Sequence, residues 1–211
     1  MKLPLQLLAA VAALGLAGCA TSSLKQTWKS PTFQGAPVKK VAVIAVVDRG
    51  LLRQGFENRF VRDLRAQAQE TISTFDLLGL PEIKADKAAA ATRLRSAGAD
   101  AVLVVRLVDQ VNYDRQVRAT SEHWVPTITG FGSNFGWYDC YDVAFMDMGT
   151  VWSSDRKKIY LDSGLHDLAT GKLLWSGLTV TTLGDSTDGL VAADNLIAKI
   201  VAAMRKDGLV R

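Results

Sequence analysis

Apolar and polar residues along this chain form blocks that predict strands and helices in turn. Residues 41–47 are a continuous aliphatic run and residues 101–108 are mostly aliphatic, the pattern of strands that are covered on both faces of a sheet. Between them, residues 51–69 repeat large apolar side chains at near-fourfold spacing, which predicts a helix with one buried stripe. A short strand near 71–77 and an Ala-rich helix capped by Asp86 complete this half. The order strand, helix, strand, helix, strand implies right-handed crossovers and a largely parallel core.

The C-terminal part of the chain has longer strand patterns. Three strands are predicted in a meander, near 141–153, 158–168 and 172–183. A short connection at Gly171 joins the last two, and a glycine there can take the positive φ of a hairpin turn. A closing helix over about 188–206 presents a stripe of apolar side chains to the sheet. The predicted fold over residues 39–211 is a single α/β domain with a mixed β-sheet, βαβαβ followed by a β-meander and a C-terminal helix.

The helix over 51–69 also carries arginines that lie mostly off its apolar stripe. They are Arg53, Arg59, Arg62 and Arg65. Glu57 follows Arg53 by four positions and Asp63 follows Arg59 by four, a spacing that brings opposite charges together on a helix. A binding patch is the alternative, but a solvated helix face with these ion pairs is the favoured interpretation.

A separate apolar run, residues 5–16, follows a single cation at Lys2 near the N-terminus. This layout is typical of a signal peptide, and at about 12 residues the run is shorter than the roughly 20 that cross a bilayer as a helix. It ends in Leu16-Ala17-Gly18-Cys19, which resembles the lipobox of bacterial lipoproteins. The alternative is that Cys19 is only a small residue near an ordinary cleavage site. We expect residues 1–18 to be a signal peptide and Cys19 to become the lipid-bearing first residue.

The resemblance to bacterial lipoproteins implies a particular anchor and location. The Cys19 thiol would take a diacylglyceryl group and its freed amine a third acyl chain such as palmitate, so the membrane is a partner through lipid alone. Ala20 stands where an acidic residue favours the inner membrane, so the expected location is the outer membrane, facing the periplasm. Residues 19–38 show neither hydrophobic period and are predicted to be the lipidated N-terminus and a flexible tether.

Charge and cysteine content narrow the picture further. The chain has 25 Lys and Arg against 21 Asp and Glu, with no block of like charges, so a nucleic-acid partner is not expected. Cys140 is the one cysteine besides Cys19, so lipidation of Cys19 excludes an intramolecular disulfide. Cys140 is then either buried or available for intermolecular pairing, and burial is favoured.

Candidate chemistry along the chain is sparse. The two histidines, His123 and His166, are distant in sequence, and neither has a His or Cys close by, so no metal site or cofactor is predicted. We interpret His166 as a surface or hydrogen-bonded strand histidine. The acids Asp139, Asp142 and Asp147 could converge as a hydrolase pair or a calcium site, but their spacing fits no recognised calcium loop. We expect no catalytic residues and no enzymatic activity.

The segment at about 119–140 is an insertion rich in aromatic residues and glycine. Its candidate partner-binding residues, extended by one position, are Trp124, Phe131, Phe135, Trp137, Tyr138 and Tyr141. One interpretation is that the rings fold back over the sheet as a local core. The other is that they form an exposed contact surface, because Trp and Tyr dominate binding hot spots.

The lipobox and residues 40–44, 97–104 and 167–177 together resemble a broad family of bacterial envelope lipoproteins. The order of elements is similar to the anticodon-binding-like α/β fold of the TolB N-terminal domain, LpoB and CsgG. Those relatives bind other envelope proteins and catalyse nothing. The resemblance implies a non-catalytic accessory or assembly factor that binds an envelope protein. The alternatives are a membrane-tethered hydrolase using acids near 139–147 and a subunit of an oligomeric secretion pore.

Overall fold

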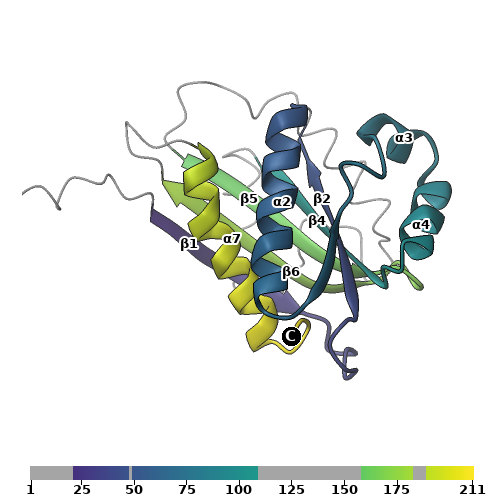
Figure 1. Cartoon of the computed structure of the whole chain (residues 1–211). Helices are drawn as coiled ribbons and strands as arrows, with labels where there is room; N and C mark the ends of the chain where they lie inside the picture. The colour runs from purple at the N-terminus through teal and green to yellow at the C-terminus, as the bar shows by residue number, and fades with distance from the viewer. Residues whose placement is uncertain (1–20, 48, 109–157, 183–188) are drawn as a thin grey trace, which may run out of the picture.

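A six-stranded mixed sheet organises the computed structural model, which describes residues 21–47, 49–108, 158–182 and 189–211. Its strands are β1 (Thr21–Lys29), β2 (Lys40–Val46), β3 (Glu70–Ser73), β4 (Ala101–Val108), β5 (Lys158–Asp167) and β6 (Leu173–Thr182). They are ordered β1-β6-β5-β4-β2-β3 across the sheet (Figure 1). β3, β2 and β4 are parallel, whereas β5, β6 and β1 each run antiparallel to their neighbours.

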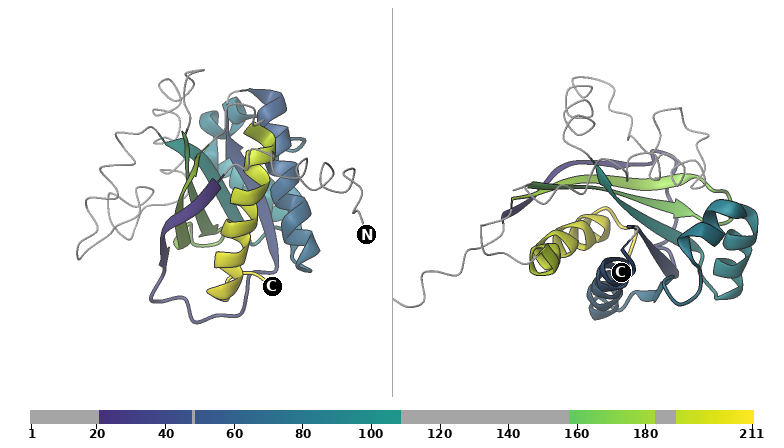
Figure 2. Two further views of the ribbon diagram at one scale, coloured as in Figure 1. Left: turned by 90° about the vertical axis from the view of Figure 1, so that its left-hand side faces the viewer. Right: turned by 90° about the horizontal axis from the view of Figure 1, so that it is seen from above.

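Helices cover both faces of this sheet. The described helices are α2 (Gly50–Ala66), α3 (Leu80–Ala85), α4 (Lys87–Ser96) and α7 (Gly189–Lys206). α2 and α7 lie side by side on one face, and α3 and α4 lie on the other, over the parallel strands (Figure 2). The predicted fold class, a mixed α/β domain with a C-terminal helix, is confirmed.

The burial of β2 explains why its sequence is a continuous apolar run. Val41, Val43 and Ala45 pack with α2 and α7 in one core cluster. Ala42 and Ile44 point the other way, into a cluster with α3 and α4. Because alternate residues of a strand face opposite sides of the sheet, a strand between two helical layers needs apolar residues at every position.

The predicted tether over residues 19–38 is wrong for β1, which is the edge strand next to β6. Its first pair joins Thr21 to Thr182, and the Ser22 hydroxyl hydrogen bonds to the Thr181 hydroxyl over 2.8 Å. The strand was missed because its large apolar residues, Leu24 and Trp28, are few and only half-buried, and because its partner β6 lies about 150 residues away in sequence. The sheet therefore includes residues that precede position 39, where the domain was predicted to start.

Other boundaries shift by a few residues. The first helix ends at Ala66 and not at 69, and the strand predicted near 71–77 is limited to Glu70–Ser73. The short helix α3 was not predicted. The positive φ of Gly171, 72°, and the side-chain cap that Asp86 provides to α4 are confirmed. The predicted strand at 141–153 lies outside the described residues.

Candidate functional site

The site residues predicted from the sequence lie outside the part of the chain that the structure describes. They are Cys19, Trp124, Phe131, Phe135, Trp137, Tyr138 and Tyr141. The acids at 139, 142 and 147, His123 and Cys140 also lie there. Their roles therefore stay predictions, and the site described below is built from other residues.

The predicted pair of Arg53 and Glu57 forms, but it is buried and not solvated. The Arg53 Nε donates to Glu57 Oε1 over 2.8 Å, and the two side chains are 5% and 0% exposed. Five further donors reach the carboxylate: Ala45 N (3.1 Å), Ser73 Oγ (2.7 Å), Thr74 N (2.8 Å), Thr74 Oγ1 (3.3 Å) and Phe75 N (2.7 Å). A carboxylate so fully satisfied fastens α2 to the ends of β2 and β3, which is a structural task.

The predicted pair of Arg59 and Asp63 does not form. Arg59 reaches Asp194 on α7 over 3.0 Å, and Asp63 pairs with Arg62 over 2.8 Å. Arg62 also contacts Asp194, at 2.9 Å. The predicted contact within α2 gave way to contacts between helices, because α7 packs alongside α2 and its Asp194 lies within reach of both Arg59 and Arg62. These ion pairs connect the two helices at their exposed side.

His166 is fully buried in β5 and has a backbone hydrogen bond at Gly171, so it is the hydrogen-bonded strand histidine of the prediction and not the surface one. Burial lowers the pKa of His166 from 6.5 to about 3, against the smaller effect of a backbone hydrogen bond at Gly171. The imidazole is therefore neutral at neutral pH. Among the described residues, no group of three or more His, Cys, Asp or Glu side chains is arranged to hold a metal ion.

A second buried ion pair crosses from β4 to β5. Arg106 Nη2 lies 3.0 Å from Asp162 Oδ2, and the two side chains are 1% and 2% exposed. They are directly paired in the strand register and share the face of the sheet that also carries His166. The sequence signal was the single charged residue in the apolar run 101–108, which was not singled out. A buried pair of this kind adds little net stability, because the cost of removing both charges from water offsets their attraction, but the loss of one partner would leave a buried charge unpaired.

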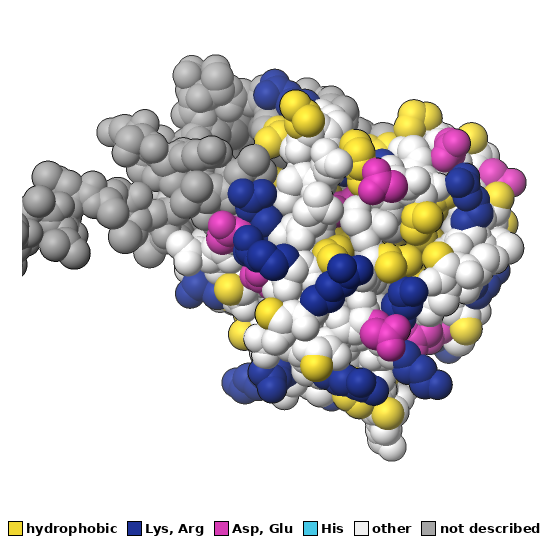
Figure 3. Space-filling view, in the orientation of Figure 1, with side chains coloured by type: hydrophobic (Ala, Val, Ile, Leu, Met, Phe, Trp, Pro, Cys, Tyr) yellow, Lys and Arg dark blue, Asp and Glu magenta, His cyan; other side chains and the backbone are white. Residues whose placement is uncertain are grey.

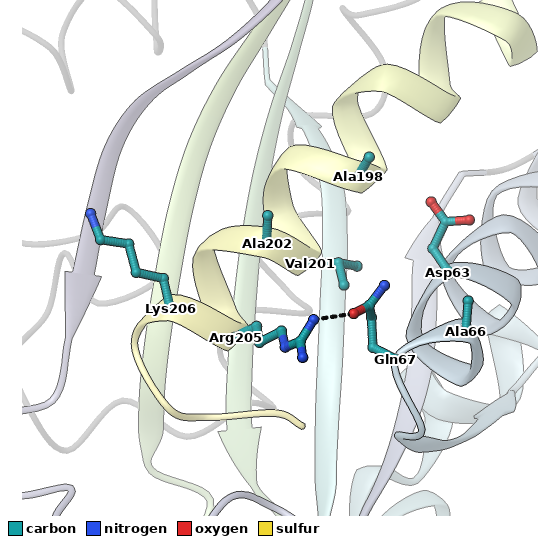
Figure 4. Close-up of a pocket in the computed structure, with 8 residues that line it drawn as sticks. All are labelled: Asp63, Ala66, Gln67, Ala198, Val201, Ala202, Arg205 and Lys206. Carbon is teal, nitrogen blue, oxygen red and sulfur yellow. Dashed lines mark hydrogen bonds between the residues drawn. The ribbon is translucent and has the colours of Figure 1, made fainter.

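An open groove lies between α2 and α7 (Figure 4). Its volume is about 710 Å³. The lining residues are Asp63, Ala66, Gln67, Ala198, Val201, Ala202, Arg205 and Lys206. Three alanines leave space between the helices, and the Arg205 guanidinium donates to the Gln67 side chain across one end. The groove thus combines an apolar floor with a polar and mostly basic rim.

This arrangement suits a protein contact better than a small polar substrate. The groove is open along the helices, and Lys and Arg side chains gather around it on the face seen in Figure 3. Its one acidic lining residue, Asp63, is already paired with Arg62. The groove was missed at the sequence level because alanine gives a weak pattern. The available signal was the pair Ala198 and Ala202, four residues apart on the outer side of the last helix.

Comparisons with known proteins give a limited result. No protein-family model matches the chain, and no curated protein matches it. Two solved structures of the PelC dodecamer from Paraburkholderia phytofirmans have TM-scores of 0.45 and 0.43, with 16% and 18% identity; each match covers 87% of this chain and 96% of the other. The lipoprotein GNA1162 from Neisseria meningitidis has a TM-score of 0.39 and 13% identity over 80% of this chain and 95% of its own. Similarities at this level say nothing about the function of this chain.

Proposed function

We propose that this protein is a lipid-anchored lipoprotein of the outer membrane, facing the periplasm, that acts as a non-catalytic accessory or assembly factor. The anchor is Cys19, at the end of the lipobox-like Leu16-Ala17-Gly18-Cys19. No helix in the described ranges is long and apolar enough to span a bilayer. In this proposal the lipid chains alone hold the domain at the membrane.

The α2–α7 groove is the observation that carries the binding role. Its floor of Ala66, Ala198 and Ala202 is exposed, although an apolar floor between two helices is usually filled by a neighbouring element. The rim offers the amide of Gln67 and the charges of Arg205 and Lys206. A partner helix or extended segment with small apolar side chains and acidic flanks matches this surface. The aromatic segment at about 119–140 would supply a second contact.

Site-specific photo-crosslinking in intact cells tests the proposal. A photoreactive amino acid at Ala202, inside the groove, should give a discrete adduct with an envelope protein. The matched control is Ala88, an exposed alanine near the start of α4, on the opposite face of the sheet. Adducts at both positions, or at neither, would contradict a contact through the groove.

The variant Ala202→Glu extends this test to binding. It should abolish the adduct formed by a photoreactive amino acid at Ala198, because the new charge lies in the groove. Ala88→Glu is the matched control: it places the same charge on an exposed helix position outside the groove, and it should leave the adduct unchanged. Both variants should unfold within about 0.5 kcal/mol of the wild type. The anchor is checked separately: Cys19→Ala should abolish labelling by radioactive fatty acid, and retained label would contradict the lipoprotein assignment.

A further inference from the structure

The distance along the chain between the proposed lipid anchor and the first strand is very short. β1 starts at Thr21, two residues after Cys19, and Thr21 is already paired with Thr182 of β6. Two residues of extended chain span at most about 7 Å. This is comparable to the thickness of one headgroup layer, since a bilayer of 40–45 Å contains a hydrocarbon core of about 30 Å. The start of β1 is therefore held at the level of the lipid headgroups, if Cys19 is acylated as proposed above.

The sheet topology then identifies which end of the domain lies at the membrane. β6 ends and β5 starts at the same end where β1 starts, because these three strands are antiparallel in turn. β4 is antiparallel to β5, and β2 is parallel to β4, so both of these strands also end there. α2 follows β2 and starts at this end with Gly50, and α7 starts here too (Figure 1). In the view of Figure 1, β1 starts at the left, and α7 and α2 start above it.

An exposed apolar side chain stands at this same end. Leu51 lies in the first turn of α2 and is 84% exposed. Among the described residues, it is the one large hydrophobic side chain with such exposure. Its neighbour Leu52 is half-buried against the core. Apolar side chains of helices at a membrane surface enter the boundary between headgroups and acyl chains to a depth of about 5–10 Å. A lipid surface is thus the partner that matches both the anchor position and this side chain.

We propose that the domain rests directly on the bilayer through the end where β1 starts, with Leu51 entering the membrane interface. This inference rests on the lipid anchor of the proposed function, but not on the partner-binding groove. The opposite end, with the β5–β6 turn and the last turn of α4, points away from the membrane. The outer side of the α2–α7 groove runs between the two ends and stays open to a partner in the periplasm.

Fluorescence quenching by labelled lipids tests the orientation. In a Cys140→Ser background, a nitrobenzoxadiazole label is attached either at Leu51→Cys or at Ser96→Cys, which lies at the end of α4 near the start of β4. The acylated protein is reconstituted into phosphatidylethanolamine and phosphatidylglycerol vesicles that contain doxyl-labelled phosphatidylcholine. We expect quenching at position 51 to exceed quenching at position 96 by at least threefold. Equal quenching at the two positions, or stronger quenching at 96, would overturn the proposal.

A spacer variant isolates the effect of the short connection. Insertion of ten Gly and Ser residues between Ala20 and Thr21 should leave acylation and folding intact and remove most of the difference between the two labels. A difference that persists with the spacer would refute the argument from chain length. Mass spectrometry of the Cys19 peptide shows whether the protein is acylated, and so whether a negative result counts against the anchor or against the orientation. Absent acylation counts against the proposed function, whereas equal quenching on acylated protein counts against the orientation alone.

Discussion

Gly177 provides the sharpest test of the packing, because the indole of Trp175 occupies the space where a side chain would be. A Cβ atom at Gly177 would lie 2.3 Å from Cη2 of Trp175 and 3.0 Å from its Cζ2 and Cζ3. Non-bonded carbon atoms normally stay about 3.5–4.0 Å apart. Gly177→Ala therefore forces either the indole or the strand to move.

The indole has little freedom to move. Trp175 is fully buried in the core cluster under α7, and its Nε1 donates to Asp207 Oδ2 over 2.9 Å. The Asp207 main-chain oxygen also accepts from Lys29 Nζ of β1 over 2.5 Å, so the residue after α7 is held from two strands. Overpacking of a tight core typically costs about 1–3 kcal/mol, and this rigid, hydrogen-bonded ring places the expected loss at about 3 kcal/mol. In a domain of this size that corresponds to a fall in Tm of roughly 6–12 °C.

The measurement is urea and thermal unfolding of the mature chain without lipid, followed by circular dichroism. The matched control is Gly50→Ala, because a Cβ there has Phe75 Cε2 as its nearest neighbour at 3.9 Å, an ordinary contact. Gly50→Ala should change the free energy of unfolding by less than about 1 kcal/mol. Trp175→Leu removes the indole that the new methyl group would meet. In the Trp175→Leu background, Gly177→Ala should therefore cost less free energy of unfolding than in the wild type, and a double-mutant cycle measures this difference. If Gly177→Ala and Gly50→Ala have the same stability, the reasoning about Trp175 is refuted.

Two further predictions concern His166 and the β5–β6 turn. Burial lowers the pKa of His166 from 6.5 to about 3, so between these pH values the unfolded chain binds a proton that the folded chain does not. The contribution of the neutral imidazole to the free energy of unfolding is therefore complete above pH 6.5 and is lost as the pH falls towards 3. The loss should reach about 3 kcal/mol at pH 4.5, and His166→Gln should flatten this part of the stability profile; an equally steep profile in the variant would exclude His166 as the cause. Gly171 has a φ of 72°, so Gly171→Val should cost about 1–2 kcal/mol in urea unfolding, and an unchanged midpoint would contradict the turn geometry.

The helices and the central strands could be predicted because their signals are local. The run 41–47 is buried on both faces, and the stripe of α2 repeats with the helical period, so each pattern reports its own environment. The edge strand β1 gave no such signal. Its more buried residues include Ser22 and Gln26, and it becomes a strand only through pairing with β6, a contact between distant parts of the chain. The predicted tether failed for that reason.

Ion pairing shows the same division between local and distant information. The spacing of Arg53 and Glu57 predicted their contact but not its burial, which depends on the loop after β3 folding over the carboxylate. For Arg59 and Asp63 the spacing was the same, yet α7 supplied Asp194 as a competing partner. Spacing of four residues fixes which side chains can meet on one helix, but the neighbouring elements decide which of them do.

The two buried ion pairs are explained by the packing of the fold, whereas the groove between α2 and α7 is not. Arg53 with Glu57 fastens α2 to the parallel strands, and Arg106 with Asp162 joins β4 to β5. Charged side chains that sit in a fold's interior are often interpreted as catalytic, but here each charge faces an opposite charge at hydrogen-bond distance. The groove between α2 and α7 is different, because its alanine floor is exposed without any such internal explanation. An apolar surface between helices that the described part of the domain does not cover is typical of a contact site, which is why we propose the groove as the binding surface.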